Sequence, residues 1–171
     1  MNPHRKLLSG IAFGLSASLS LPAFAQNGDA CQPFTVVSDG SDRTVDYIDN
    51  GAPGPSAGDQ RIGYRSLADQ DGNPVGHYRW IGTVLNQPGD DGTVGESVYE
   101  YIMALGDGHI GYHRLVQTDS PAQDTSGVAW DTTQSAIVTG GTGAYAFAHG
   151  TVTISRDDMV VTMEFDIACD D

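Results

Sequence analysis

Lysine is almost absent from this chain of 171 residues, whose only lysine is Lys6. Residues 26–171 contain six arginines and all 22 acidic residues, so that part of the chain has a net charge of −16. A surface this acidic repels the phosphates of nucleic acids and of anionic membranes, and we expect no nucleic-acid partner. Solubility, or adaptation to salty surroundings, explains the charge better than an electrostatic function does.

Long apolar runs are also scarce, and the single one lies at the start of the chain. Arg5 and Lys6 precede an apolar run over residues 7–21, which ends in the small-x-small pattern of Ala23-Phe24-Ala25. These features predict a cleaved secretory signal peptide over residues 1–25. A transmembrane anchor is the alternative, but the run is short for a span of about 20 residues. Residues 26–171 are therefore expected to form one domain, secreted or periplasmic, with no membrane span.

Cysteine is limited to two residues, Cys31 and Cys169. In an oxidising compartment two such residues usually pair, and we predict a disulfide between them. In a closed barrel the first and last strands are neighbours, so this disulfide can join them. A metal pair or a catalytic thiol is the weaker alternative, because the two cysteines lack the close spacing of a metal site.

No long helical periodicity is present, and Gly, Pro, Asn and Asp interrupt the chain at short intervals. This pattern is typical of an all-β barrel or sandwich. Strands are predicted at residues 34–38, 43–48, 60–68, 74–86, 96–105, 109–117, 133–139, 144–155 and 159–168. Turn residues lie between them, including a glycine-rich segment over 140–143 that predicts a tight hairpin.

Alternation of apolar and polar residues predicts which side chains share a face. In the last predicted strand, Val161, Met163, Phe165 and Ile167 are expected to point one way. The strand over 96–105 differs, because both of its faces are largely apolar. Such a strand is expected where the outer face is also covered, for example by another subunit.

Motifs for cofactors and metals are weak in this sequence. Gly141–Ala146 matches the spacing of a dinucleotide-binding loop, but a strand-like segment follows it instead of the required helix. His109 and His113 share a strand face without further ligands, and the segment 69–73 lacks the late Glu of a calcium loop. We therefore expect neither a cofactor nor a metal.

Three stretches, over residues 58–76, 106–110 and 136–152, each carry a short glycine-containing motif. The strongest is the Ile-Val-Thr-Gly-Gly-Thr-Gly segment over 137–143, which Ala148-His149-Gly150 follows. Together they resemble the allene oxide cyclase and dirigent barrel family. This resemblance implies a single closed eight-stranded antiparallel β-barrel with an interior cavity, usually assembled as a homotrimer. Family members cyclise a reactive oxidised fatty acid or steer the coupling of phenolic radicals, without a cofactor in the barrel.

The resemblance also indicates where a site would lie, and where this chain departs from the plant cyclases. Their cavity cysteine falls near Gly82 and their cavity asparagine at Arg65, while an early carboxylate matches Asp46. If the family's strand register holds, Tyr78, Trp80 and Gly82 face inward. These departures indicate that this chain shares the fold of the plant cyclases rather than their reaction.

The candidate catalytic residues are Asp46, Arg65 and Glu100. An inward Arg65 can hold a carboxylate or stabilise an oxyanion, and a buried Asp46 or Glu100 can act as a general acid. The alternative is that all three face solvent. The candidate cavity-lining residues are Tyr78, Trp80, Gly82 and Tyr101. The alternative is that these residues only fill the interior of the barrel.

Three functions follow as hypotheses. The first is an exported, cofactor-free cyclase or isomerase that orients a small hydrophobic, lipid-like or phenolic-like substrate. The second is a non-catalytic binding barrel comparable to a lipocalin, and the third is a structural envelope protein with a filled barrel. Convergent polar groups in a cavity favour the first hypothesis, a purely apolar and aromatic lining favours the second, and a filled barrel favours the third.

Overall fold

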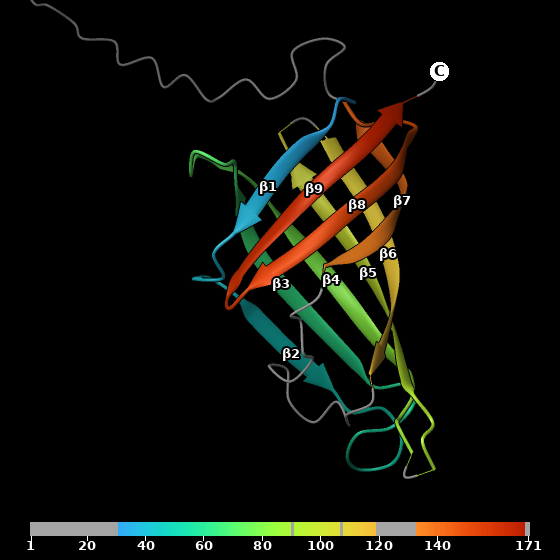
Figure 1. Cartoon of the computed structure of the whole chain (residues 1–171). Coiled ribbons are helices and arrows are strands. Elements are labelled where there is room, and N and C mark those ends of the chain that lie inside the picture. Colours follow the sequence, from blue (N-terminus) through green and yellow to red (C-terminus); the bar gives the residue numbers. More distant parts are fainter. Residues whose placement is uncertain (1–30, 90, 107, 119–132, 170–171) are drawn as a thin grey trace, which may run out of the picture.

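The computed structural model describes residues 31–89, 91–106, 108–118 and 133–169. These residues form nine β-strands (Figure 1). The strands are β1 (Phe34–Ser38), β2 (Thr44–Ile48), β3 (Gln60–Ala68), β4 (Pro74–Asn86), β5 (Gly95–Leu105), β6 (Gly108–Thr118), β7 (Gln134–Gly143), β8 (Ala148–Asp157) and β9 (Val160–Cys169). Within the described ranges, no helix is long and apolar enough to cross a membrane.

The strands form one antiparallel sheet that closes on itself. Its order is β1-β9-β8-β7-β6-β5-β4-β3-β2, and β1 also pairs with β3 through Val37 and Ala68. This additional pairing closes eight strands into a barrel and leaves β2 as an extra strand on β3. The predicted all-β, eight-stranded closed barrel is confirmed. Closure pairs both sides of the barrel strands, which would otherwise offer unpaired backbone groups to other chains, and leaves an outer edge on β2.

The hairpin predicted over residues 140–143 is wrong in position. Strand β7 continues through Gly143, where its glycines pair with β6, and the turn lies at residues 144–147. Close packing explains the glycines, because a Cβ on Gly141 would lie 2.2 Å from the carbonyl oxygen of Tyr145. The glycines therefore allow the turn to fold back tightly against the strand.

A disulfide joins Cys31 to Cys169 at the end of β9, as predicted. It lies at the end of the barrel that carries the β7–β8 turn, since Ala148 pairs with Cys169. The bond is consistent with a protein outside the cytoplasm. The predicted signal peptide over residues 1–25 lies outside the described residues and stays a prediction.

The end of the barrel that carries the disulfide is filled with apolar side chains. Leu67, Leu105, Ile110 and Ile167 are all buried there, and the Phe34 ring stacks on Phe165 with centroids 4.7 Å apart. Such close-packed filling leaves no room for a ligand. The interior cavity lies in the other half of the barrel.

Candidate ligand cavity

Three rows of inward-facing residues run across β3, β4, β5 and β6, and the strand register defines them. Members of one row are direct cross-strand partners. The arginine row is Arg61, Gly82, Tyr99 and Arg114; the aromatic row is Gly63, Trp80, Tyr101 and Tyr112; the third row is Arg65, Tyr78, Met103 and Ile110. The aromatic row thus lies between two rows that each contain a cation.

Two glycines make room for the large rings of these rows. A Cβ on Gly63 would lie 2.1 Å from the Trp80 ring, and one on Gly82 would lie 2.4 Å from the Tyr99 ring. In both cases the glycine is the cross-strand partner of the ring that covers it. An aromatic side chain laid over a strand glycine packs well and fixes the register.

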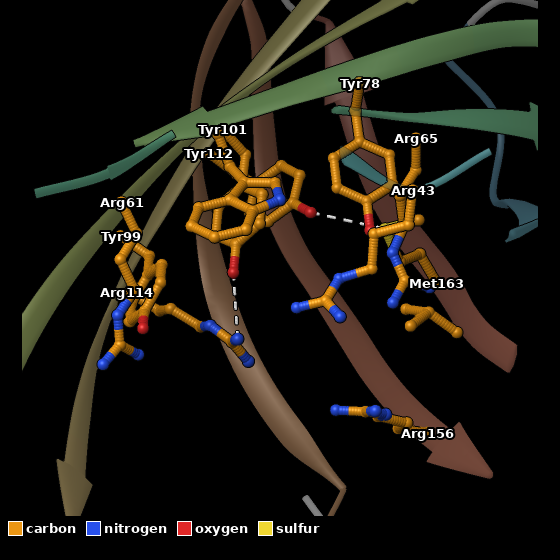
Figure 2. A pocket seen from close by; sticks show the side chains of 12 residues that line it. Arg43, Arg61, Arg65, Tyr78, Tyr99, Tyr101, Tyr112, Arg114, Arg156 and Met163 are labelled. Atoms are coloured by element: carbon orange, nitrogen blue, oxygen red, sulfur yellow. Dashed lines mark hydrogen bonds between the residues drawn. The ribbon is translucent and has the colours of Figure 1, made fainter. Parts of the chain in front are cut away.

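The tyrosines form a connected aromatic wall (Figure 2). The rings of Tyr101 and Tyr112 are stacked with centroids 4.4 Å apart, and the Tyr99 ring lies 6.2 Å from that of Tyr101. Tyr78 lies 6.1 Å from Tyr101, and Trp80 lies 5.6 Å from Tyr99. These contacts hold the rings in place, so the wall presents a preformed surface to a flat ligand.

The wall lines a cavity whose other sides carry arginines together with Val161 and Met163. Its volume is about 70 Å³ for the centres of water-sized molecules, against roughly 10–15 Å³ for one water on that measure. The lining residues are Arg43, Arg61, Arg65, Tyr78, Trp80, Tyr99, Tyr101, Tyr112, Arg114, Arg156, Val161 and Met163. Five of these are arginines, and no Asp or Glu occurs among the described residues of the lining.

Arg114 is held against the aromatic wall. Its guanidinium carbon lies 5.6 Å from the centroid of the Tyr99 ring and 5.5 Å from that of the Tyr101 ring. One of its terminal nitrogens donates a hydrogen bond to the Tyr101 hydroxyl at 2.9 Å, and another donates to Gln134. Cation–π contact and hydrogen bonding together orient both the charge and the phenol.

Burial keeps the hydroxyls of Tyr78, Tyr101 and Tyr112 protonated. Desolvation raises the pKa of Tyr78, Tyr101 and Tyr112 above the ordinary value, and for Tyr101 the nearby charge of Arg114 opposes this shift. The Tyr112 hydroxyl donates to the sulfur of Met163 at 3.3 Å. The phenols are therefore neutral hydrogen-bonding groups near neutral pH rather than bases.

A buried carboxylate, Asp59, organises the loop between β2 and β3. It accepts hydrogen bonds from the Tyr47 hydroxyl, from the backbone N–H of Asn50 and from both the N–H and the hydroxyl of Ser56. The Tyr47 bond, followed by those from Ser56 and Asn50, lowers the pKa of Asp59 to about 2. Asp59 does not line the cavity and acts as a structural anchor.

Comparison with known proteins reveals similarity in structure. No family model and no curated protein matches the chain. Among solved structures, pyocyanin demethylase matches with a TM-score of 0.56 and 25% identity over 80% of this chain and 99% of that one. The Diels-Alderase of Streptomyces koyangensis matches with a TM-score of 0.53 and 13% identity, over 78% of this chain and 68% of that one.

A cyclase that catalyses a cycloaddition during neoabyssomicin biosynthesis also matches, with a TM-score of 0.53 and 15% identity. The match covers 79% of this chain but 63% of that cyclase. The chain has the fold of the allene oxide cyclase and dirigent barrels. The resemblance read from the sequence is thus confirmed at the level of the fold.

Within this barrel fold, most of the predicted cavity residues lie at the cavity. Tyr78, Trp80 and Tyr101 line it, and so does Arg65. Gly82 is buried on the same face and lies under the Tyr99 ring rather than against the open space. The inward parity expected for β4 therefore holds in the structure.

The two candidate carboxylates are not brought together with Arg65. Asp46 and Glu100 are both exposed and absent from the lining. Glu100 follows Tyr99 and precedes Tyr101, whose side chains point inward, so the pleat directs Glu100 outward. Asp46 lies on β2, outside the closed barrel, opposite Ile62. The expectation that these carboxylates are buried beside Arg65 is corrected.

Four lining arginines were not identified from the sequence: Arg43, Arg61, Arg114 and Arg156. One signal was present, since Arg61 and Arg65 are separated by an even number of residues and share a strand face. The apolar Ile62 and Tyr64 on the opposite face hid that signal. Within the described ranges, no group of three His, Cys, Asp or Glu is arranged to hold a metal ion.

Proposed function

We propose that this protein is an exported enzyme of the cyclase or isomerase type, which orients a small, largely hydrophobic molecule inside the barrel. The observation that carries the proposal is a cavity with a preformed aromatic wall and convergent guanidinium groups. A ring or polyene can pack on the tyrosines, while a buried cation fixes its orientation. A binding barrel without catalysis is the alternative that an aromatic wall by itself would support.

Arg65 is the residue to which we assign the principal electrostatic role. It is 4% exposed and lines the cavity beside its cross-strand partner Tyr78. A guanidinium in such a site can stabilise negative charge that develops on an oxygen of the substrate, and it does so more strongly than in water. The chemistry proposed here needs only groups of this chain.

The structural relatives support a role in small-molecule chemistry. Pyocyanin demethylase acts on pyocyanin, and the two cycloaddition enzymes catalyse bond formation on small molecules. We extend this class of activity to the present chain, with its substrate left to experiment.

The test is native mass spectrometry of the protein purified from its own host, followed by organic extraction and incubation of the extracted compound with fresh protein. A bound molecule that is converted into an isomer supports the enzyme. A bound molecule that is recovered unchanged supports the binding barrel instead. A protein without any bound molecule would favour a structural role.

We further propose that the barrel assembles as a homotrimer. Its outer face over β4–β7 exposes large aliphatic side chains, among them Ile102 at 61%, Leu115 at 53% and Ile137 at 61%. Apolar patches of this kind mark interaction surfaces. Light scattering should show Ile102→Asp dissociating the assembly, while Val160→Asp, at an exposed aliphatic outside this face, leaves it intact. A monomeric wild-type protein would contradict the proposal.

A further inference from the structure

The arginines of the cavity lie in two groups around the aromatic wall. Figure 2 shows Arg61 and Arg114 on one side, and Arg43, Arg65 and Arg156 on the other. Arg61 and Arg65 lie on the same face of β3, four residues apart, which places their Cα atoms about 13 Å from each other. The two groups are therefore separate sites of positive charge with the tyrosines between them.

Arg65 and Arg156 are anchored to the same short turn. Arg65 donates to the backbone carbonyl of Met159 at 2.8 Å, and Arg156 donates to that of Asp158. These consecutive carbonyls belong to the connection between β8 and β9. Two guanidinium groups that come from β3 and β8 are thereby anchored to one turn at the same side of the cavity (Figure 2).

Holding two cations together in a partly buried place is unfavourable unless an anion balances them. Exposed Asp39 is near enough for Arg65 to contribute to the lowering of its pKa, but this is the smallest of the causes. Asp39 does not line the cavity. Each guanidinium uses one nitrogen for its backbone bond, and its planar fork presents further N–H donors suited to a carboxylate.

We propose that the molecule bound in this cavity is a planar aromatic acid, whose carboxylate lies between Arg65 and Arg156 and whose ring lies on Tyr78 and Tyr101. This inference rests on the proposed function and narrows its substrate from a hydrophobic molecule to an anionic one. Tyr78 is the cross-strand partner of Arg65, so a ring attached to the bound carboxylate meets the wall directly. Charge supplies the orientation and stacking supplies the contact area.

The experiment compares two probes that differ only in charge, 2-naphthoate and 2-naphthamide, by titration calorimetry at pH 7. Naphthoate should bind wild-type protein at least tenfold more tightly than the amide. Arg156→Gln should lower naphthoate affinity at least tenfold and leave the affinity for the amide unchanged. Arg156 is half-buried, so we expect this variant to fold, and its thermal melting serves as the check.

Arg79→Gln is the matched control, because it removes the same charge from the outside of the barrel. Arg79 is exposed, lies over the Tyr64 ring and does not line the cavity. It should leave the affinity for both probes unchanged, and a loss as large as that of Arg156→Gln would overturn the inference.

The remaining outcomes separate this inference from the proposed function. Equal affinity for acid and amide would overturn the anionic ligand and leave a small-molecule barrel standing. If neither probe binds and the molecule extracted from the native protein is neutral, only the inference falls. If neither probe binds and no molecule is extracted from the native protein, both the anionic ligand and the proposed function are contradicted. Extraction of an aromatic acid would support the inference.

Discussion

The inside and the outside of this barrel carry opposite charge. Five of the six arginines beyond residue 25 line the cavity. Most acidic residues of the described ranges are exposed instead, and Asp59 is the buried exception. Arg79 alone of the described arginines lies on the outer face and outside the cavity lining.

A carboxylate at the surface and a guanidinium inside the barrel differ greatly in energetic cost. A carboxylate on the surface stays hydrated, whereas a guanidinium inside a barrel loses hydration that its partners must replace. Arg61, Arg65 and Arg114 are each about 95% buried. The placement of the few cations in the costly position supports the proposed ligand site, since stability alone would favour apolar residues there.

The contrast in charge between the inside and the outside requires a closed barrel. We expect the largest effect from removing the disulfide that joins its two ends. Replacing Cys31 and Cys169 together by Ser should lower the free energy of unfolding by up to about 4–5 kcal/mol, because the bond closes a long loop. This corresponds to a fall in Tm of roughly 10 °C. Calorimetry of the variant against the oxidised protein measures it, and an unchanged Tm would contradict a stabilising disulfide.

Removing a cation from inside the barrel should affect ligand binding far more than removing one from the outside. Arg65→Ala is expected to reduce ligand binding or turnover at least 100-fold, because a buried charged hydrogen bond contributes several kcal/mol. Arg79→Ala removes an outer cation and should change neither by more than about twofold. Affinity for the extracted ligand is the measurement, and similar values for both variants would remove Arg65 from the site.

A methyl group added at a glycine can test the inner and the outer face of the barrel in the same way. Gly63→Ala should cost about 1–3 kcal/mol and disturb the Trp80 ring, which lies where the new Cβ would be. Gly111→Ala is the outer control, since its Cβ would meet no atom closer than 3.5 Å. Urea unfolding and tryptophan emission report both changes, and equal costs would contradict the packing argument.

Acid should reveal the contribution of the buried carboxylate Asp59 to stability. Because its pKa is about 2 in the folded protein and ordinarily 3.8, Asp59 contributes stability that is present above about pH 4. That contribution is lost as the pH falls toward 2. Asp59→Asn should flatten this part of the urea-midpoint profile, and Tyr47→Phe should flatten it partly. A profile unchanged in Asp59→Asn would show that the loss has another origin.

Much of the fold could be predicted from the sequence. Turn residues and alternation located the nine strands, and the apolar face of β9 followed from a period of two. The inward face of β4 followed from the family resemblance. The cysteines at the two ends indicated their own pairing. These features are local, or depend on the ends of a closed barrel being neighbours, so a linear sequence carries them.

The site depended on contacts between distant strands. Alternation in β3 separates Arg61 and Arg65 from Ile62 and Tyr64, but it does not say which set is inside. The pairing of Gly63 with Trp80 decides that question, and the same pleat turns Glu100 outward. The sequence by itself determined a disulfide-closed β-barrel with an acidic exterior. Only the tertiary structure placed arginines from four separate segments around one aromatic wall, because register and closure are relations between strands that no single strand encodes.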